Sequence, residues 1–159
     1  MPETTNTHRP LVLVADPNAE SAAMISRQLL WAGYDVVTAS NGTDALELLD
    51  ERRPDAAVLE VMMEGCTGYD VVRRLRSEQS TALLPVVLIS ARAGKLDRDF
   101  AFTVGADDYV KKPFRTSDLV SRLALLLPTP AAPVPEQPVG SFTRRRRRPA
   151  RPLQPALAR

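Results

Sequence analysis

Short apolar runs alternate with amphipathic segments along most of this chain, and this alternation limits the possible folds more than any other feature. Apolar runs that end in a polar residue or a turn lie at 11–15, 34–39, 55–60, 85–90 and 108–111. Continuous runs of this length are typical of strands that are buried on both faces. The segments between them place apolar residues at helical spacing, at 19–32, 42–53, 96–104 and 116–127, and from the loop that contains Gly65 and Gly68 to about residue 76.

Five strands that alternate with five helices predict an α/β fold, a doubly wound five-stranded parallel sheet of the flavodoxin-like type with helices on both faces. Ligand sites of such sheets lie beyond the carboxyl ends of the strands, where the strand order reverses. Four polar residues stand at or just after predicted strand ends, namely Asp16, Glu60, Ser90 and Lys112. The last helix should be capped by Thr116 or Ser117.

Charge and proline divide the chain unevenly. The net charge is +2, but residues 128–159 carry +6 and eight of the 14 prolines, whereas residues 1–127 carry −4. We therefore expect a disordered lead at 1–9, one folded domain at 10–127 and a Pro/Arg-rich disordered tail at 128–159. The tail contains a run of five arginines, Arg144, Arg145, Arg146, Arg147 and Arg148.

Several function classes are excluded by composition and motifs. Cys66 is the single cysteine and His8 the single histidine, so an internal disulfide, a thiolate metal site and a histidine-rich metal cluster are excluded. The glycine patterns of dinucleotide-binding and P-loop proteins are absent. No apolar run approaches the ~20 residues that span a bilayer, and no hydrophobic leader opens the chain. We expect a soluble cytoplasmic protein that is not transmembrane.

Motifs along residues 10–127 resemble the receiver (CheY-like) domain of two-component response regulators. The motif Gly-Ala-Asp-Asp-Tyr-Val-Lys-Lys-Pro-Phe near the fifth strand is the most specific of them. The matching stretches are Val12–Asp16, Pro54–Leu59, Val61–Met63 with Gly65, Gly68 and Tyr69, Pro85–Ala91, and Gly105–Phe114.

The resemblance implies where the chemistry of the family would lie. In that family, two adjacent acids after the first strand help to hold Mg²⁺, and an Asp at the end of the third strand accepts a phosphoryl group from a kinase histidine. These positions are Asp16 and Pro17 for the acid pair and Glu60 for the acceptor. Met62 would supply a backbone carbonyl to the metal, so the implied metal set is Asp16, Glu60 and Met62.

The resemblance also assigns the residues around the phosphoryl group. Ser90 and Lys112 would bind its oxygens, and Tyr109 would be the aromatic residue that reports the change. The Lys112–Pro113 peptide bond is expected to be cis, an isomer that is common only before proline.

Two departures from the family pattern bear on the reaction itself, since the acceptor is Glu60 rather than Asp and the second acid is Pro17. Phosphoryl transfer depends on an in-line nucleophile and on a metal that neutralises charge. Glu places its carboxylate one methylene further out, and misplacement by about 1 Å can cost on the order of 100-fold in rate. Pro17 removes an oxygen ligand, so we expect Mg²⁺ binding to be weak or absent.

Glu60 has two interpretations that the sequence leaves open. As a standing mimic of the phosphorylated state, its longer carboxylate would reach Ser90 or Lys112, with a charge of −1 against about −1.5 to −2 for a phosphoryl group. Alternatively, it fills an inactive pocket and pairs with Lys112. Both interpretations predict a protein that works independently of a kinase.

The arginine run has three interpretations. It binds nucleic acid through phosphate charges, it binds an anionic membrane surface, or it is a solvated tail. No aromatic residues are interleaved for base stacking, because Phe142 stands alone.

The first functional hypothesis is an atypical single-domain receiver, not an enzyme, that acts by protein–protein interaction. Its signalling partner, a histidine kinase or a downstream effector, would bind a face formed by residues 91–104, Tyr109 and 116–127, and a homodimer is an open alternative. One alternative function is a working phosphorelay receiver with Glu60 or a displaced acid as acceptor. Another is a nucleic-acid-associated protein that acts through its tail.

Overall fold

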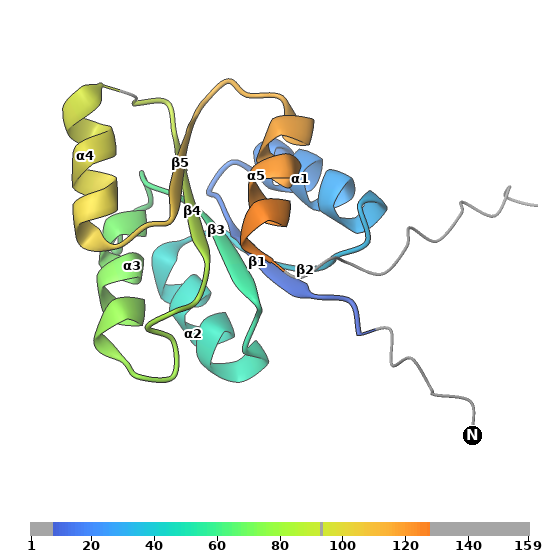
Figure 1. Ribbon diagram of the computed structural model, residues 1–159, viewed down its shortest axis with the longest axis horizontal. Coiled ribbons are helices and arrows are strands. Elements are labelled where there is room, and N and C mark those ends of the chain that lie inside the picture. The colour runs from blue at the N-terminus through green and yellow to red at the C-terminus, as the bar shows by residue number, and fades with distance from the viewer. Residues whose placement is uncertain (1–7, 93, 128–159) are drawn as a thin grey trace, which may run out of the picture.

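The structure is a computed structural model that describes residues 8–92 and 94–127. Figure 1 shows a central sheet with helices packed against both of its faces. The strands are β1 (Leu11–Ala15), β2 (Asp35–Ala39), β3 (Ala56–Glu60), β4 (Val86–Ser90) and β5 (Asp108–Lys111). The helices are α1 (Ala19–Trp31), α2 (Gly42–Arg52), α3 (Gly68–Ser77), α4 (Lys95–Val104) and α5 (Thr116–Leu126).

The sheet topology confirms the predicted fold class. All strand pairs are parallel, and the strand order is β2-β1-β3-β4-β5. The ten elements occur in the predicted order, and most boundaries lie within one residue of their predicted positions. Helix α3 begins at Gly68, which the prediction places in the loop before it. The order reverses at β1, which lies between β2 and β3, so the predicted ligand region falls beyond the carboxyl ends of β1 and β3.

Two apolar layers hold the helices against the sheet. In Figure 1, α1 and α5 cover one face, and α2, α3 and α4 cover the other. The first layer includes Ile25, Leu29 and Leu123, and the second includes Leu49 and Leu75. The side chains of β3 and β4 are buried along the full length of both strands. This explains why these two strands read as continuous apolar runs rather than as an alternating pattern.

Polar side chains cap the starts of three helices, and the predicted cap of a fourth helix is not found. Asn18 and Asn41 accept backbone N–H bonds at the starts of α1 and α2, and Thr67 forms a capping box with Asp70 at the start of α3. The prediction that Thr116 or Ser117 caps α5 is wrong. Thr116 is already helical, and the cap position is held by Arg115 without a side-chain hydrogen bond.

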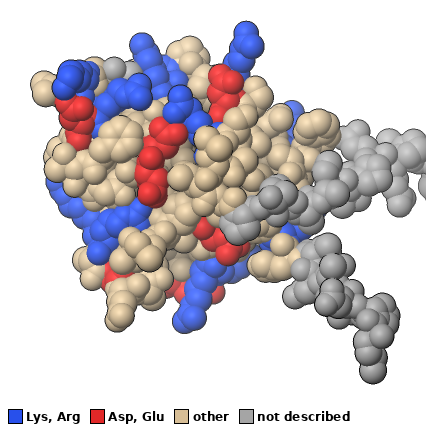
Figure 2. Space-filling model, viewed as in Figure 1, with Lys and Arg blue, Asp and Glu red and all other residues tan. Residues whose placement is uncertain are grey.

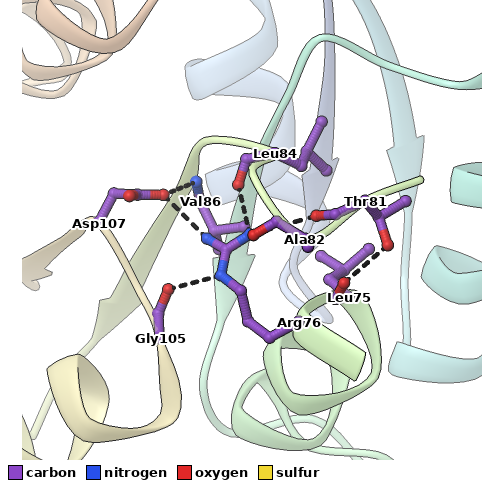
Figure 3. Close-up of polar contacts among 8 residues, drawn as sticks. All are labelled: Leu75, Arg76, Thr81, Ala82, Leu84, Val86, Gly105 and Asp107. Atoms are coloured by element: carbon purple, nitrogen blue, oxygen red, sulfur yellow. Dashed lines mark hydrogen bonds and ion pairs between the residues drawn. The ribbon is translucent and has the colours of Figure 1, made fainter. Parts of the chain in front are cut away.

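An arginine at the amino edge of the sheet joins several segments (Figure 3). The guanidinium group of Arg76, near the end of α3, donates to carbonyls of the α3–β4 loop and of the α4–β5 turn. It also pairs with Asp107 at 3.0 Å, and the same carboxylate oxygen accepts the Val86 N–H at 2.8 Å. The accepting carbonyls belong to Thr81, Ala82, Leu84 and Gly105. Sequence analysis did not single out Arg76, because its role depends on loop carbonyls that carry no sequence signal.

The chain before β1 also contacts the domain. Arg9, which the predicted boundaries place in the lead, donates to the carbonyls of Leu30, Gly33 and Tyr34. The tail from residue 128, including the arginine run, lies outside the described residues. Within the described part, no helix is both long enough and apolar enough to cross a membrane. On the face in Figure 2, basic and acidic side chains are interspersed.

Candidate functional site

The four polar residues predicted at strand ends meet at the carboxyl edge of the sheet. The register pairs Ala15 with Leu59, so the residues that follow them, Asp16 and Glu60, lie side by side on neighbouring strands. Ser90 ends β4, and Lys112 follows β5. Asp16 is 2% exposed, Glu60 6% and Ser90 0%. Two carboxylates therefore lie close together in a nearly buried environment, where an unpaired charge would carry a large desolvation cost.

Lys112 bridges both carboxylates. Its ammonium nitrogen lies 2.7 Å from Asp16 Oδ2 and 2.7 Å from Glu60 Oε2. Because β4 separates β5 from β3, the lysine side chain extends past β4 to reach the ends of β3 and β1. The preceding peptide bond is fixed in place by the backbone, since the Lys112 N–H donates to the Ser90 carbonyl at 2.7 Å. The Lys112–Pro113 bond is cis, as expected.

The remaining carboxylate oxygens also have donors. Asp16 Oδ1 accepts the backbone N–H of Asn18 at 2.8 Å, and Glu60 Oε1 accepts that of Met62 at 3.1 Å. Each of the four oxygens therefore accepts one hydrogen bond from this chain's own groups. Charge-assisted hydrogen bonds of this kind hold both carboxylates in defined orientations.

The charge state of Lys112 follows from opposing effects. Burial by itself lowers the pKa of the ammonium group, but hydrogen bonds and charges from Asp16 and Glu60 outweigh it. The pKa of Lys112 is therefore raised above its usual value of 10.5. The lysine is a cation at neutral pH, and the three side chains together carry a net charge of −1.

A glycine allows α3 to begin against the third strand. A Cβ atom on Gly68 would lie 2.6 Å from the Glu60 carbonyl oxygen, so only glycine permits this approach. The Gly68 N–H donates to the Val61 carbonyl at 2.9 Å. These contacts set the course of the loop that carries Met62 past the pocket.

The donor set at this edge does not fit a divalent metal. Mg²⁺ requires near-octahedral oxygen coordination, usually from one or two carboxylates plus waters or phosphates. Pro17 contributes no side-chain oxygen, and the lysine already engages both Asp16 and Glu60. Among residues 8–92 and 94–127, no group of three His, Cys, Asp or Glu side chains is arranged to hold a metal.

Ser90 and Tyr109 lie beside the pocket without touching the carboxylates. The Ser90 hydroxyl accepts the Arg92 N–H at 3.1 Å, and no hydrogen bond joins it to Glu60 in the described structure. Of the two partners considered for Glu60, Lys112 is the one it contacts. Tyr109 is 1% exposed, and its hydroxyl donates to the Arg92 carbonyl.

A second tyrosine, Tyr69, lies close to Tyr109. Burial, followed by the proximity of Tyr109, raises the pKa of Tyr69 to about 12. The Tyr69 ring packs edge-on against Phe100 of α4, with ring centroids 4.8 Å apart. Tyr109 thus contacts the segment that follows Ser90 through its hydroxyl, and it lies close to Tyr69.

The expected partner face is formed by α4, β5 and α5. A shallow cavity of about 560 Å³ runs along it, lined by Arg98, Tyr109 and Phe114 among others. Arg122 pairs with Asp108 at 2.9 Å beside it. Phe102 of α4 and Leu125 of α5 are exposed, whereas Phe100 of α4 packs against Tyr69 of α3.

Comparison with known families assigns the class of protein that this fold and site define. Residues 12–124 match the family described as "Response regulator receiver domain". The chain belongs to this family. A receiver domain is a signalling domain rather than an enzyme, and it implies a partner in two-component signalling.

Individual relatives are longer than the region that matches this chain. The transcriptional regulatory protein PrrA of Mycobacterium tuberculosis is 40% identical over 123 residues, which are 77% of this chain and 52% of PrrA. The DNA-binding response regulator MtrA of the same species is 36% identical over 118 residues, which are 74% of this chain and 50% of MtrA. The chain therefore spans about half the length of these relatives.

Solved structures agree with the fold. The chemotaxis protein CheY4 of Vibrio cholerae is 28% identical with a TM-score of 0.72, and the match covers 76% of this chain and all of CheY4. The receiver domain of a Francisella response regulator is 30% identical with a TM-score of 0.70, covering 74% of this chain and 96% of that domain.

Proposed function

We propose that this chain is an atypical receiver that signals by protein–protein interaction and does not depend on phosphorylation. The observation that carries the proposal is the contact of Lys112 with Glu60 and Asp16 at 2.7 Å. In the family, a lysine at this place binds a phosphoryl oxygen. Here a carboxylate oxygen of Glu60 takes the place of that phosphoryl oxygen, so Lys112 binds a group that belongs to the chain itself.

Glu60 is a poor nucleophile in this arrangement. One of its oxygens is bound by the ammonium group of Lys112 and the other by the Met62 N–H. A nucleophile must approach phosphorus in line, with a metal to neutralise the charge. Glu60 is 6% exposed, and Pro17 leaves the metal without its second acid. We therefore assign Glu60 as a fixed substitute for the acceptor, in an atypical member that lacks the acceptor Asp.

Mimicry of the phosphorylated state is partial. Glu60 brings one negative charge, whereas a phosphoryl group would bring about −1.5 to −2 and three acceptor oxygens. The carboxylate engages Lys112 but leaves the Ser90 hydroxyl to Arg92. We propose that Tyr109 is held in its buried position by the same Arg92 segment, which makes this aromatic residue a fixed reporter rather than a moving one.

The partner surface that we propose is the face of α4, β5 and α5. Exposed Phe102, one helical turn after Arg98, and exposed Leu125 offer apolar area, and the Arg122–Asp108 pair offers charge at the same face. Interfaces of signalling proteins typically combine an apolar centre with a polar rim. The occupant is a signalling partner such as a histidine kinase or an effector, and a second copy of the chain is the alternative.

A role in nucleic-acid binding is the less favoured function. It rests on the arginine run at 144–148 and on the names of relatives that regulate transcription. On the face in Figure 2, the folded domain mixes both signs of charge and presents no uniform basic surface. We keep 10–127 as the proposed receiver domain and 128–159 as a proposed tail.

The proposal is tested by intact mass spectrometry after incubation with acetyl phosphate and Mg²⁺. The double variant Pro17→Asp, Glu60→Asp is the matched positive control, since it restores both acids of the family pattern. We expect the natural chain to gain no phosphoryl group and the double variant to gain one.

The variant Glu60→Gln shows which residue carries any phosphoryl group that the natural chain gains. A phosphoryl group that appears on it and disappears in Glu60→Gln would make Glu60 the acceptor, and the chain a working phosphorelay receiver. A phosphoryl group that survives Glu60→Gln would place the acceptor elsewhere. Either result contradicts the proposed function.

A further inference from the structure

We infer that the ammonium group of Lys112 is the resident cation of the pocket and takes the place of a divalent metal between Asp16 and Glu60, an inference that rests on the proposed function. Its Nζ atom lies 2.7 Å from one oxygen of each carboxylate. Both carboxylates are nearly buried, and a cation between them is what such a pair requires.

The lysine reaches this place from a third strand end. Lys112 follows β5, and its side chain extends past β4 to Glu60 and to Asp16 on β3 and β1. The Lys112 side chain is mostly buried, with 22% of its area exposed. One side chain thus joins three strand ends, whereas a metal would join only the two that carry acids.

A divalent metal would have to displace this contact. It would need an oxygen from Asp16 and one from Glu60 at about 2.0–2.1 Å, the distance that Mg²⁺ demands. The other oxygen of each carboxylate accepts a backbone N–H, so the metal would compete with Lys112 for Asp16 Oδ2 and Glu60 Oε2. Displacement would leave the ammonium group partly buried beside a second cation, which Coulomb repulsion opposes strongly at this distance.

Pro17 stands where a third carboxylate would favour metal binding. An acid there would add a third carboxylate and bring the charge of the acid cluster to −3, enough for both a divalent ion and the lysine. With Pro17, the two carboxylates carry −2, and the lysine has already neutralised half of this charge. The remaining −1 does not compensate the dehydration of Mg²⁺, which this ion resists.

The proposal that the Lys112 ammonium group takes the place of a metal ion can be tested by replacing Lys112. Without its charge, Asp16 and Glu60 face each other unpaired, and the pocket should become a weak divalent site. We compare the full chain with Lys112→Met and with Lys111→Met, a control that removes the same charge from the neighbouring exposed position. Mn²⁺ binding is followed by the electron paramagnetic resonance signal of the free ion, and thermal unfolding is recorded with and without Mg²⁺.

We expect no bound Mn²⁺ and no rise in melting temperature for the natural chain and Lys111→Met at about 10 mM metal, above the range of weak biological sites. Lys112→Met should bind Mn²⁺ and melt at a higher temperature as Mg²⁺ is added. Metal binding by the natural chain would overturn the inference, as would a Lys112→Met variant that gains none. If Lys112→Met is unfolded in metal-free buffer, addition of Mg²⁺ should restore a cooperative thermal unfolding transition. A variant that stays unfolded with Mg²⁺ would contradict the inference.

The outcome is separable from that of the proposed function. Mn²⁺ binding by the natural chain refutes the resident cation even when acetyl phosphate leaves Glu60 unmodified. A phosphoryl group on Glu60 refutes phosphorylation independence even when the natural chain binds no Mn²⁺ in the absence of a phosphodonor.

Discussion

Lys112 is the residue on which the carboxyl edge of the sheet depends. Removing one partner of a buried ion pair typically costs about 3–5 kcal/mol, because the remaining charge is left uncompensated. Lys112→Met leaves two such carboxylates, so we expect a loss of this size in the free energy of unfolding measured with urea. Lys111→Met removes an equal charge from an exposed site and should change stability by no more than about 0.5 kcal/mol. Equal losses in the two variants would contradict the bridge.

The raised pKa of Lys112 gives this contribution a defined pH dependence. The folded pKa lies above the unfolded value of 10.5, so the folded state binds the proton more tightly. The stabilisation is complete below pH 10.5 and is lost as the pH rises through the folded pKa. The stability difference between the natural chain and Lys112→Met should therefore be constant near neutral pH and shrink in strongly alkaline urea titrations. A difference that grows with pH would reverse the sign of the linkage.

At the scale of elements, α3 carries the loop that borders the pocket, and its first turn is held by the Thr67–Asp70 capping box. Thr67→Ala removes the cap and should lower the free energy of unfolding by about 1 kcal/mol. Hydrogen bonds from the Thr67 backbone and hydroxyl lower the pKa of Asp70, so this part of the stability falls as the pH drops through the folded pKa. Ser80→Ala, in the following loop, is the control. A Thr67→Ala variant as stable as the natural chain would show that the cap contributes nothing.

Arg76 holds the opposite edge of the sheet together (Figure 3). Hydrogen bonds to charged groups are worth about 1.5–3 kcal/mol, and Arg76→Met leaves several loop carbonyls without a donor. We expect a loss of about 2–3 kcal/mol and faster amide hydrogen exchange in residues 78–86 and at Gly105. Arg74→Met, on the exposed side of the same helix, is the matched control. Unchanged exchange in these segments would show that Arg76 does not hold them.

How far each element could be predicted depends on whether its cause is local. The strands β3 and β4 were predicted because burial on both faces requires continuous apolar runs, and α1 because Asn18 and Gly33 mark its ends. The cap of α5 was not predicted correctly, because Thr116 and Arg115 differ by one position and the turn before them decides which is helical. Arg76 was missed because its partners are backbone atoms of distant loops.

For the molecule as a whole, the topology converts strand ends into a site. Parallel strands place their last residues at one edge, so Asp16, Glu60 and Lys112 could be grouped from sequence alone. Sequence could not tell that Lys112 contacts both acids at once, nor that the Ser90 hydroxyl is taken by Arg92. Several possible hydrogen-bond partners lie within a few ångströms of each of these side chains, and strand register and side-chain length decide which contact forms.

The two edges of the sheet have different roles in this account. The amino edge, with Arg76, joins loops of the fold, and the carboxyl edge, with Lys112, would determine the state of the receiver under the proposed function. The face of α4, β5 and α5 lies between them and contacts both, through Gly105 at one end and Tyr109 at the other. A partner that binds this face would meet a single conformation that the chain itself maintains.

The most direct test of this account is one pair of ¹H–¹⁵N spectra of the natural chain, recorded before and after addition of Mg²⁺ and acetyl phosphate. The Pro17→Asp, Glu60→Asp variant is measured in parallel to show that the reagents work. We predict that the amide signals of residue 60, Ser90 and Lys112 stay in place when the reagents are added to the natural chain, and that the signals at the same three positions move in the variant. Movement of these signals in the natural chain would show a pocket that still takes up metal or phosphoryl groups, and it would contradict the central claim.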